Sequence, residues 1–377
     1  ARRKVPGAGG TQAVKRGCGR SPPEIDCDMI ARDEKRTAAQ GRRRRGRRSR
    51  SAGLTGAVSE PHPRNLFAGM HTRRDVHRRR DTAWLAETIR SESAVFVPVC
   101  EEHTLVDSHP REPRPRLLRY GEVAAMKLSV EHAVYLGEHR ARPCFALDVP
   151  GDHAPHLDGL GRLESLRGHA MAVPAEDAGL LAYARAMVLW HRTHRFCPRC
   201  GAPSLPAEGG HLRICSRRVC GGRQFPRLDP AVIVLVSHGA RCLLGRQPNW
   251  PAGRYSTVAG FVEPGEGLED AVCREVHEET NIRVTRVRYH SSQPWPFPSS
   301  LMLGFSAEAL NTDIRLNDGE LDDAAWFTRE EILRLVTGGG GSLPLEMSIA
   351  FRLIATWFDG DEPGRLQRHL VEAREAG

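Results

Sequence analysis

Short runs of apolar residues alternate with turn-forming residues between positions 82 and 192. Three of these runs have the length and the β-branched and aromatic content of strands: AVFVPVC (94–100), HAVYLGE (132–138) and CFALDV (144–149). Residues 177–194 follow, and there Leu181, Ala184 and Val188 recur at near-helical spacing. The pattern predicts a small α+β domain over 82–192.

The second half of the chain has a similar mixture of patterns. AVIVLVSHGARCLLGRQ (231–247) predicts two strands around a turn. Residues 268–280 predict an amphipathic helix, and a last helix is expected near 346–358. In the first of these helices the apolar residues recur every fourth position: Leu268, Val272 and Val276. The fold class predicted for the whole chain is α+β with several domains.

Charge is distributed unevenly along the chain. Residues 1–80 hold 22 lysines and arginines against 7 acidic residues, whereas the remainder holds 33 against 39. The basic part has almost no apolar periodicity, which predicts a disordered tail. Two interpretations are open: a tail that contacts phosphates of RNA or membranes, and an irregular N-terminus without a function. No run reaches the about 20 apolar residues of a membrane span, and no secretion signal is evident, so we expect a cytoplasmic protein without a membrane partner.

Four of the ten cysteines form one cluster, in which Cys197 and Cys200 are followed by Cys215 and Cys220. Two thiolate pairs on either side of a short hairpin are the ligand set of a tetrahedral structural Zn²⁺, and Gly201 permits a tight turn after the first pair. The alternative is four ordinary buried cysteines. The length of the chain and this clustering favour a zinc site in a reducing compartment over a disulfide framework.

The stretch REVHEETN (274–281) contains three glutamates, of which Glu275 and Glu279 would repel each other at i,i+4 on a helix. One interpretation is a solvated helical face. The other is a divalent cation between the carboxylates, because Mg²⁺ and Mn²⁺ prefer oxygen ligands. Glu278 lies within one turn of both, and Arg274 is spaced to orient Glu278.

These glutamates belong to a longer pattern that resembles the Nudix box, G-x5-E-x7-R-E-U-x-E-E-x-G-U, in which U is aliphatic. The matching residues are Gly260, Glu266, Arg274, Glu275, Val276, Glu278, Glu279 and Ile282. The one departure is Asn281, where the pattern has glycine, and asparagine also tolerates left-handed geometry at a helix C-terminus. The resemblance implies a Nudix hydrolase domain, an α/β/α sandwich with a mixed sheet that cleaves nucleoside diphosphates linked to another group.

A proline-rich aromatic loop follows the box. SQPWPFPSS (292–300) interleaves three prolines with Trp295 and Phe297, so its backbone cannot pair fully in a sheet. A purely structural loop and a platform for stacking a planar ring are both open interpretations. The loop is similar to the S-Q-P-W-P-F-P-x-S signature of NADH pyrophosphatases, Nudix enzymes that also carry a zinc ribbon and an additional N-terminal domain.

This resemblance implies metal-dependent hydrolysis of NAD(H) to nicotinamide mononucleotide and AMP, extended to the removal of NAD caps from RNA, by a homodimer. The alternative is a Nudix hydrolase of another substrate, such as an ADP-sugar or a dinucleoside polyphosphate. A zinc-ribbon nucleic-acid binder that has lost catalysis is a third hypothesis, against which the complete set of glutamates argues. The implied boundaries are a tail over 1–80, an N-terminal domain over 82–192, a zinc ribbon over 193–226 and a Nudix domain over 227–365.

The resemblance also assigns site residues. The expected Mg²⁺ or Mn²⁺ ligands are the Ala259 carbonyl, Glu275, Glu279 and Glu320, and the expected catalytic residues are Arg274, Glu275, Glu278 and Glu279. The expected substrate contacts are Phe225, Phe261, Ser292, Gln293, Pro294, Trp295, Pro296, Phe297, Pro298, Ser299 and Ala350. Two features depart from the family pattern, Gly210 at an often acidic position and the C-x4-C spacing of the second cysteine pair. We expect them to alter substrate preference without abolishing catalysis.

Overall fold

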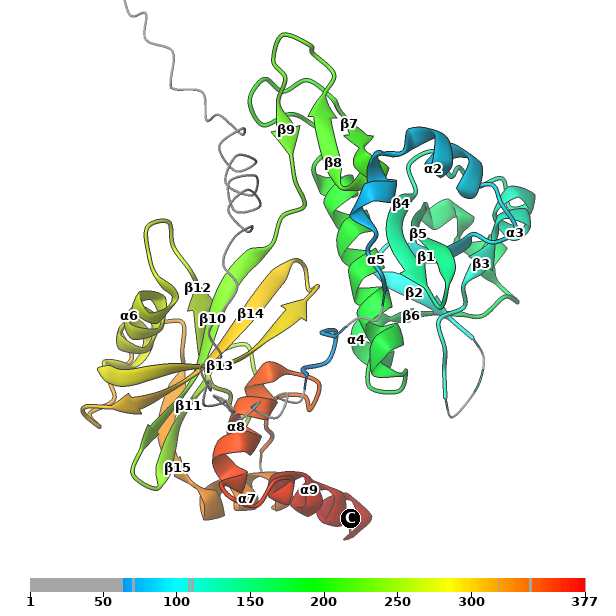
Figure 1. Cartoon of the computed structure of the whole chain (residues 1–377). Coiled ribbons are helices and arrows are strands. Elements are labelled where there is room, and N and C mark those ends of the chain that lie inside the picture. The colour runs from blue at the N-terminus through cyan, green and yellow to red at the C-terminus, as the bar shows by residue number, and fades with distance from the viewer. Residues whose placement is uncertain are drawn as a thin grey trace, which may run out of the picture. The chain divides into compact units, whose positions relative to one another are not determined.

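The structure is a computed structural model that describes residues 64–69, 72–107, 109, 112–317, 319–338 and 341–376. These residues belong to one compact unit, in which three sheets follow one another along the chain (Figure 1). Most of the predicted basic tail, residues 1–63, lies outside the described residues. Within the described ranges, no helix combines the length and the apolar character needed to cross a membrane.

The predicted tail boundary at residue 80 is wrong, because residues 64–69 and 72–80 are part of the fold. Phe67 is only 3% exposed. The backbone of Arg73 exchanges two hydrogen bonds with that of Glu138, of 3.0 and 2.9 Å, at the edge of the first sheet. A segment rich in arginine can thus be held by one buried ring and a few backbone hydrogen bonds, which the charge pattern does not reveal.

The N-terminal domain is built on a six-stranded sheet in the order β4-β5-β1-β2-β6, with β3 paired to β1 and with β1 parallel to β5. Its strands are β1 (Val95–Cys100), β2 (His103–Val106), β3 (Leu118–Arg119), β4 (Val134–His139), β5 (Arg142–Val149) and β6 (Arg162–Ser165). Its helical elements are η1 (Val76–Arg80), α2 (Thr82–Thr88), α3 (Tyr120–Ala125), η2 (Gly151–Leu157), α4 (Leu166–His169) and α5 (Ala175–Thr193).

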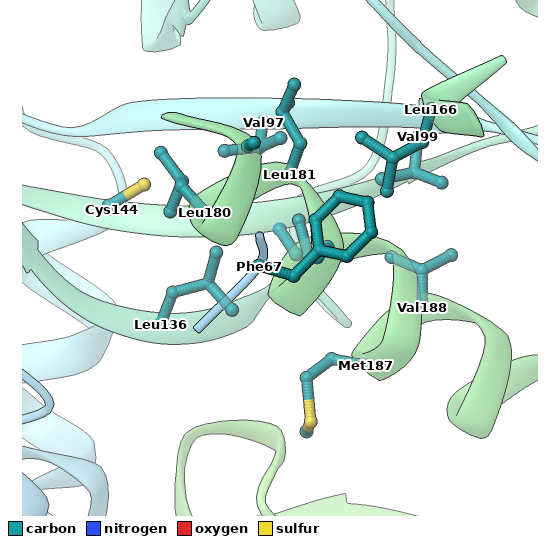
Figure 2. Packing of buried hydrophobic residues seen from close by; sticks show 14 of the residues in the cluster. Phe67, Val97, Val99, Leu136, Cys144, Leu166, Leu180, Leu181, Met187 and Val188 are labelled. Carbon is teal, nitrogen blue, oxygen red and sulfur yellow. The ribbon is translucent and has the colours of Figure 1, made fainter. Parts of the chain in front are cut away.

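Alternate residues of β1 face two separate cores. Val97 and Val99 pack with Leu181 and Val188 of α5, as Figure 2 shows. Phe96 faces the other side, where α2 and α3 cover the sheet. Because both faces of β1 are covered, the strand reads as a continuous apolar run.

The cysteine cluster accompanies a three-stranded antiparallel sheet formed by β7 (Ser204–Ala207), β8 (Leu212–Cys215) and β9 (Arg223–Gln224), with the short helix η3 (Glu208–Gly210) between β7 and β8. Cys215 ends β8, and the other three cysteines lie in the turns outside the strands. Buried polar contacts fix it to α5. Arg213 Nη1 donates to His191 Nδ1 at 2.7 Å, and His191 Nε2 donates to the Gly210 carbonyl at 2.7 Å. Burial lowers the pKa of His191 to about 4, so the ring is neutral and its Nδ1 can accept this hydrogen bond.

The C-terminal domain has a mixed sheet in the order β13-β14-β10-β11-β15, with β12 paired to β10. Only the β10–β14 pair is parallel. The strands are β10 (Asp229–His238), β11 (Arg241–Arg246), β12 (Val258–Phe261), β13 (Val284–Trp295), β14 (Ser300–Ala309) and β15 (Asp323–Thr328). The helices are α6 (Leu268–Thr280), α7 (Arg329–Thr337), α8 (Ile349–Asp359) and α9 (Arg365–Ala376).

Helices cover both faces of this sheet. Val232 and Val234 of β10 pack in the core beneath α6, whereas Ile233 packs on the opposite side with α8. The predicted α+β multidomain class with an α/β/α sandwich is therefore confirmed. The predicted domain end at 365 is too early, because Leu366 of α9 is fully buried in the α8 core. The few apolar residues of α9 are spread among charged ones, which hid this packing.

Candidate active site

Helix α6 places two of its three box glutamates on its buried side. Ala271, Val272 and Val276 are fully buried against the sheet. The same packing leaves Glu279 only 4% exposed and Glu275 only 9% exposed. Carboxylates in such positions need partners, because burying an uncompensated charge is costly.

Arg274 is the main hydrogen-bonding partner in this group. Its Nε and Nη2 donate to the two carboxylate oxygens of Glu266 at 2.6 and 2.9 Å. Its Nη2 also donates to the Phe261 carbonyl at 2.9 Å, and its Nη1 lies 3.0 Å from Glu278 and 2.9 Å from Glu275. The Arg274 guanidinium lowers the pKa of Glu266 to about 2, and the Glu266 carboxylate in turn raises the pKa of Arg274. The arginine thereby ties the loop ahead of α6 to the helix.

The electrostatics around Glu275 favour a cation. Burial raises the pKa of Glu275, the neighbouring Arg274 lowers it, and the charges of Glu320 and Glu278 raise it further. Glu320 is thus close enough for its charge to act on Glu275, although Glu320 itself is exposed in the turn before β15. Glu278 is the outermost of the three, with 53% of its side chain exposed.

The oxygen-rich donor set fits a divalent cation of the Mg²⁺ or Mn²⁺ kind. Among the described residues, however, the four cysteines are the one group of three or more potential ligands whose ligand atoms all lie within 4.8 Å of one another. The carboxylates of Glu275, Glu279 and Glu320 are near neighbours, but the three do not all lie within 4.8 Å of one another.

A cavity of about 250 Å³ opens beside Glu279. Its lining brings together five of the predicted site residues: Ala259, Glu279, Gln293, Trp295 and Ala350. These residues come from β12, α6, β13 and α8, so the two sequence motifs meet in space although they are separated along the chain. Trp295 contributes an aromatic side chain to the lining of this cavity.

The sequence did not reveal all of the lining. Arg167, from the short helix α4 of the N-terminal domain, also lines the cavity, and its guanidinium lies 5.8 Å from the Trp295 ring centroid. Trp250 and Arg254, between β11 and β12, line it as well. No local pattern marks these residues, because only the tertiary fold brings them to the site.

Gln293 has a structural role beyond lining the cavity. It is fully buried, and its amide nitrogen donates to the carbonyls of Met347 at 2.7 Å and Leu66 at 3.2 Å. Its amide oxygen accepts from the Ile349 backbone N–H at 2.8 Å. A single side chain therefore connects the aromatic loop to the start of α8.

The other residues of the loop are divided between different surroundings. Ser292, Pro294, Pro296 and Ser299 line a second cavity of about 720 Å³, and Trp295 is shared by both cavities. Phe297 packs against the N-terminal core, and it forms a cis peptide bond with Pro298.

Phe225 and Phe261, two predicted substrate contacts, do not line the cavity beside Glu279. They are 67% and 60% exposed respectively. Ile214, Val219 and Leu228 of the ribbon and its exit are also exposed. One copy of the chain therefore leaves several large apolar side chains facing outward.

The four clustered cysteines converge, as their spacing predicts. The Sγ atoms of Cys197 and Cys220 are 3.7 Å apart, those of Cys200 and Cys215 are 3.5 Å apart, and all four lie within 4.8 Å of one another. Backbone N–H groups, that of Arg199 foremost, lower the pKa of Cys197 to about 7 and favour its thiolate. This arrangement fits a closed tetrahedral zinc site.

Gly210 has a steric explanation. Its φ of 89° is in the left-handed region, and a Cβ there would lie 2.9 Å from both Val134 methyl groups on β4. An acidic side chain, as the family pattern often has, does not fit this backbone. The residue instead uses its carbonyl, which accepts the hydrogen bond from His191.

Three family models match successive parts of the chain. They describe a NADH pyrophosphatase-like rudimentary NUDIX domain over 93–190, a NADH pyrophosphatase zinc ribbon domain over 192–225 and a NUDIX domain over 227–344. Their order agrees with the three sheets. The geometry of the glutamate helix agrees with the NUDIX domain match, and the converging cysteines agree with the zinc ribbon match.

The chain is similar to several proteins named as NAD-capped RNA hydrolases. The chain is 41% identical over 230 residues to NudC of Deinococcus radiodurans, covering 60% of this chain and 80% of that protein. It is 40% identical to NudC of Chromobacterium violaceum, covering 58% and 78%. It is 45% identical to NUDT12 of Macaca fascicularis, covering 48% of this chain but only 42% of that protein. The chain therefore belongs to the Nudix hydrolase family, in the NADH pyrophosphatase-like branch, while it spans less than half of the NUDT12 relative.

Proposed function

We propose that this protein hydrolyses the pyrophosphate linkage of NAD(H) to nicotinamide mononucleotide and AMP, and that it also removes NAD caps from RNA. The observation that carries the proposal is the cavity in which Glu279 and Ala259 of the box region meet Trp295 of the aromatic loop. The lining thus combines an acidic residue and a backbone segment of the box region with a planar aromatic ring. The names of the relatives, NAD-capped RNA hydrolases, agree with a dinucleotide substrate.

Glu275, Glu279, Glu320 and the Ala259 carbonyl would hold Mg²⁺ or Mn²⁺. The cations would neutralise charge on the pyrophosphate and favour attack by water. Arg274 positions Glu275 and the loop ahead of α6, because it contacts Glu275, Glu266 and Glu278 at once. The carboxylates also offer acceptors for the proton that the attacking water loses.

The aromatic loop would bind the nicotinamide mononucleotide half. Trp295 offers a face for stacking, and Gln293 holds the loop against α8, which carries Ala350 into the same cavity. We further propose a homodimer, in which a second copy covers exposed rings such as Phe225 and Phe261 and brings them to the substrate. Large exposed apolar side chains of this kind are typical of interaction surfaces.

Product analysis tests the reaction directly. Purified full-length protein is incubated with NADH and Mn²⁺, and the products are separated by chromatography. Nicotinamide mononucleotide and AMP are expected from the wild type and from Glu269→Gln, which changes an exposed glutamate in the first turn of α6. They are not expected from Glu279→Gln. Turnover of ADP-ribose or a dinucleoside polyphosphate without turnover of NADH would instead favour the alternative Nudix substrates.

The RNA part of the proposal is tested by truncation. The basic residues upstream of Arg64 would add phosphate contacts to an RNA chain but not to free NADH. Removing residues 1–63 is therefore expected to weaken decapping of NAD-capped RNA at low salt and to leave NADH hydrolysis unchanged. Equal decapping with and without these residues would remove any role for them.

A further inference from the structure

The segment Arg64–Gly69, which we call the strap, lies against the aromatic loop although more than 220 residues separate the two in sequence. None of the three matching family models reaches it, since the first of them begins at residue 93. Asn65 and Phe67 of the strap are 4% and 3% exposed. Its contacts with the loop are polar on one side and aromatic on the other.

The polar contacts fix the start of the loop. The amide nitrogen of Asn65 donates to Ser291 Oγ and to the Ser292 carbonyl, both at 2.9 Å. The Leu66 carbonyl accepts one of the two hydrogen bonds that the buried Gln293 amide donates. Without the strap, Gln293 would keep its contacts with α8 and lose this acceptor, which leaves a buried donor only partly satisfied.

The aromatic contacts fix the middle of the loop. The Phe67 ring lies edge-on to Trp295 and Phe297, with centroid distances of 6.4 and 6.0 Å. Figure 2 shows Phe67 among the aliphatic side chains of the N-terminal core. Phe67 therefore links that core to the ring that stands in the wall of the proposed catalytic cavity.

The sheet supports only part of this loop, since residues 292–295 end β13 and pair with residues 300–303 of β14. Three of its residues are prolines, which cannot donate backbone hydrogen bonds to a neighbouring strand. Two of its carbonyls are instead held by side chains, that of Ser292 by Asn65 and that of Pro296 by Arg185. The strap thus adds side-chain and backbone contacts to the support that β14 gives to the first residues of the loop.

We propose that the strap positions the aromatic loop for substrate, with Asn65 and Phe67 as positioning residues that set affinity for the nicotinamide mononucleotide half. This inference rests on the proposed function for the identity of the ligand. The physical link is short, because Trp295 both contacts Phe67 and lines the cavity. A loop that is free to move would have to be ordered at each binding event, which weakens binding.

The test compares Asn65→Ala and Phe67→Leu with two controls in the full-length protein. Arg73→Ala removes an exposed side chain a few residues after the strap. The backbone of residue 73 pairs with β4, and this pairing is kept. Leu105→Ala creates a cavity in the core on the opposite face of the N-terminal sheet, so it lowers stability without touching the strap. Hydrogen exchange of the 292–300 backbone amides, KM and kcat for NADH, and calorimetric binding of nicotinamide mononucleotide and AMP are measured for each.

For the two strap variants we expect faster exchange confined to 292–300, and KM and the dissociation constant of nicotinamide mononucleotide raised about tenfold. AMP binding and kcat should change less than about threefold, because the strap is proposed to support binding of the nicotinamide mononucleotide half alone. Unchanged loop exchange and unchanged mononucleotide affinity in both variants would overturn the proposal, as would equal effects in Leu105→Ala. If the wild type does not cleave NADH, the proposed function fails by itself, and loop exchange alone then decides the role of the strap.

Discussion

Gly260 lies so close to Glu275 that a Cβ at residue 260 would stand 1.9 Å from the carboxyl carbon of Glu275. The strand that carries Ala259 and the helix that carries the glutamates thus approach at a point where only a hydrogen atom fits. This contact explains in physical terms why the first position of the box is glycine. Any larger residue must displace the carboxylate or separate β12 from α6.

Gly260→Ala is accordingly expected to lower kcat/KM by about 100-fold, because a displacement of about 1 Å is enough for a loss of that size. Steady-state kinetics with NADH measure the effect, and thermal melting checks that the fold is kept. Gly121→Ala is the matched control, since a Cβ at that position meets no atom within 4 Å. Near wild-type activity in Gly260→Ala would contradict the proposed role of Glu275.

A second prediction concerns the charge of Glu275 without metal. The pKa of Glu275 is raised in the folded protein, so ionisation of this group lowers the free energy of unfolding of the metal-free protein. The loss of stability is complete once the pH exceeds the pKa of Glu275 in the folded state. Glu275→Gln is therefore expected to melt at a higher temperature than the wild type in EDTA at pH 8. The difference should shrink as the pH falls toward the ordinary pKa of a glutamate, where the wild-type carboxyl is protonated as well.

Adding Mn²⁺ should reverse that order. A cation that binds the folded wild type and is present at a concentration 100 times its dissociation constant adds about 2.7 kcal/mol to the free energy of unfolding. The variant should gain much less, because it lacks a ligand. Thermal melts at pH 5 and pH 8, each in EDTA and in Mn²⁺, provide the comparison. If Glu275→Gln is less stable than the wild type in EDTA at pH 8, burial of the carboxylate is already compensated and the prediction is wrong.

Site residues that belong to one local sequence motif could be predicted from the sequence. The box glutamates fall on one helix, so their spacing gives their relative positions, and the predicted helix over 268–280 agrees with α6. Asn281 ends that helix with a φ of 62°, as its place at the glycine position of the box predicts. The four cysteines converge for the same reason, since each pair is joined by a short turn.

The remaining site residues depend on contacts that no local pattern records. Arg167 reaches the cavity from a short helix of another domain, and Phe67 reaches the aromatic loop from a segment whose composition is that of a disordered tail. Gln293 matches the loop signature but is fully buried, and it holds elements together as well as lining the cavity. Tertiary packing decides which signature residues face substrate and which support them.

The third prediction concerns zinc. Cys200→Ser is expected to lose the metal, since four thiolates define the site, and to melt at a lower temperature because structural zinc contributes roughly 10 kcal/mol to the folding of such modules. Zinc per chain is measured by atomic emission after dialysis, together with thermal melting. Cys273→Ser, which changes an exposed cysteine on α6, should retain one zinc per chain. Equal zinc in both variants would exclude Cys200 as a ligand.

The last prediction concerns Gly210, where the family pattern often has an acidic residue. Gly210→Ala should lower the free energy of unfolding by about 2–5 kcal/mol, about 1–2 from the left-handed backbone and about 1–3 from the contact with Val134. Gly159→Ala isolates the first contribution, because that residue has a φ of 82° and open space around its Cβ. Urea unfolding measures both variants. The double variant Val134→Ala/Gly210→Ala should be less destabilised than the sum of the two single changes predicts, since the smaller side chain removes the close contact. If Gly210→Ala and Gly159→Ala lower the free energy of unfolding equally, crowding against β4 does not explain the glycine at position 210. Its presence would then have to be explained by substrate preference.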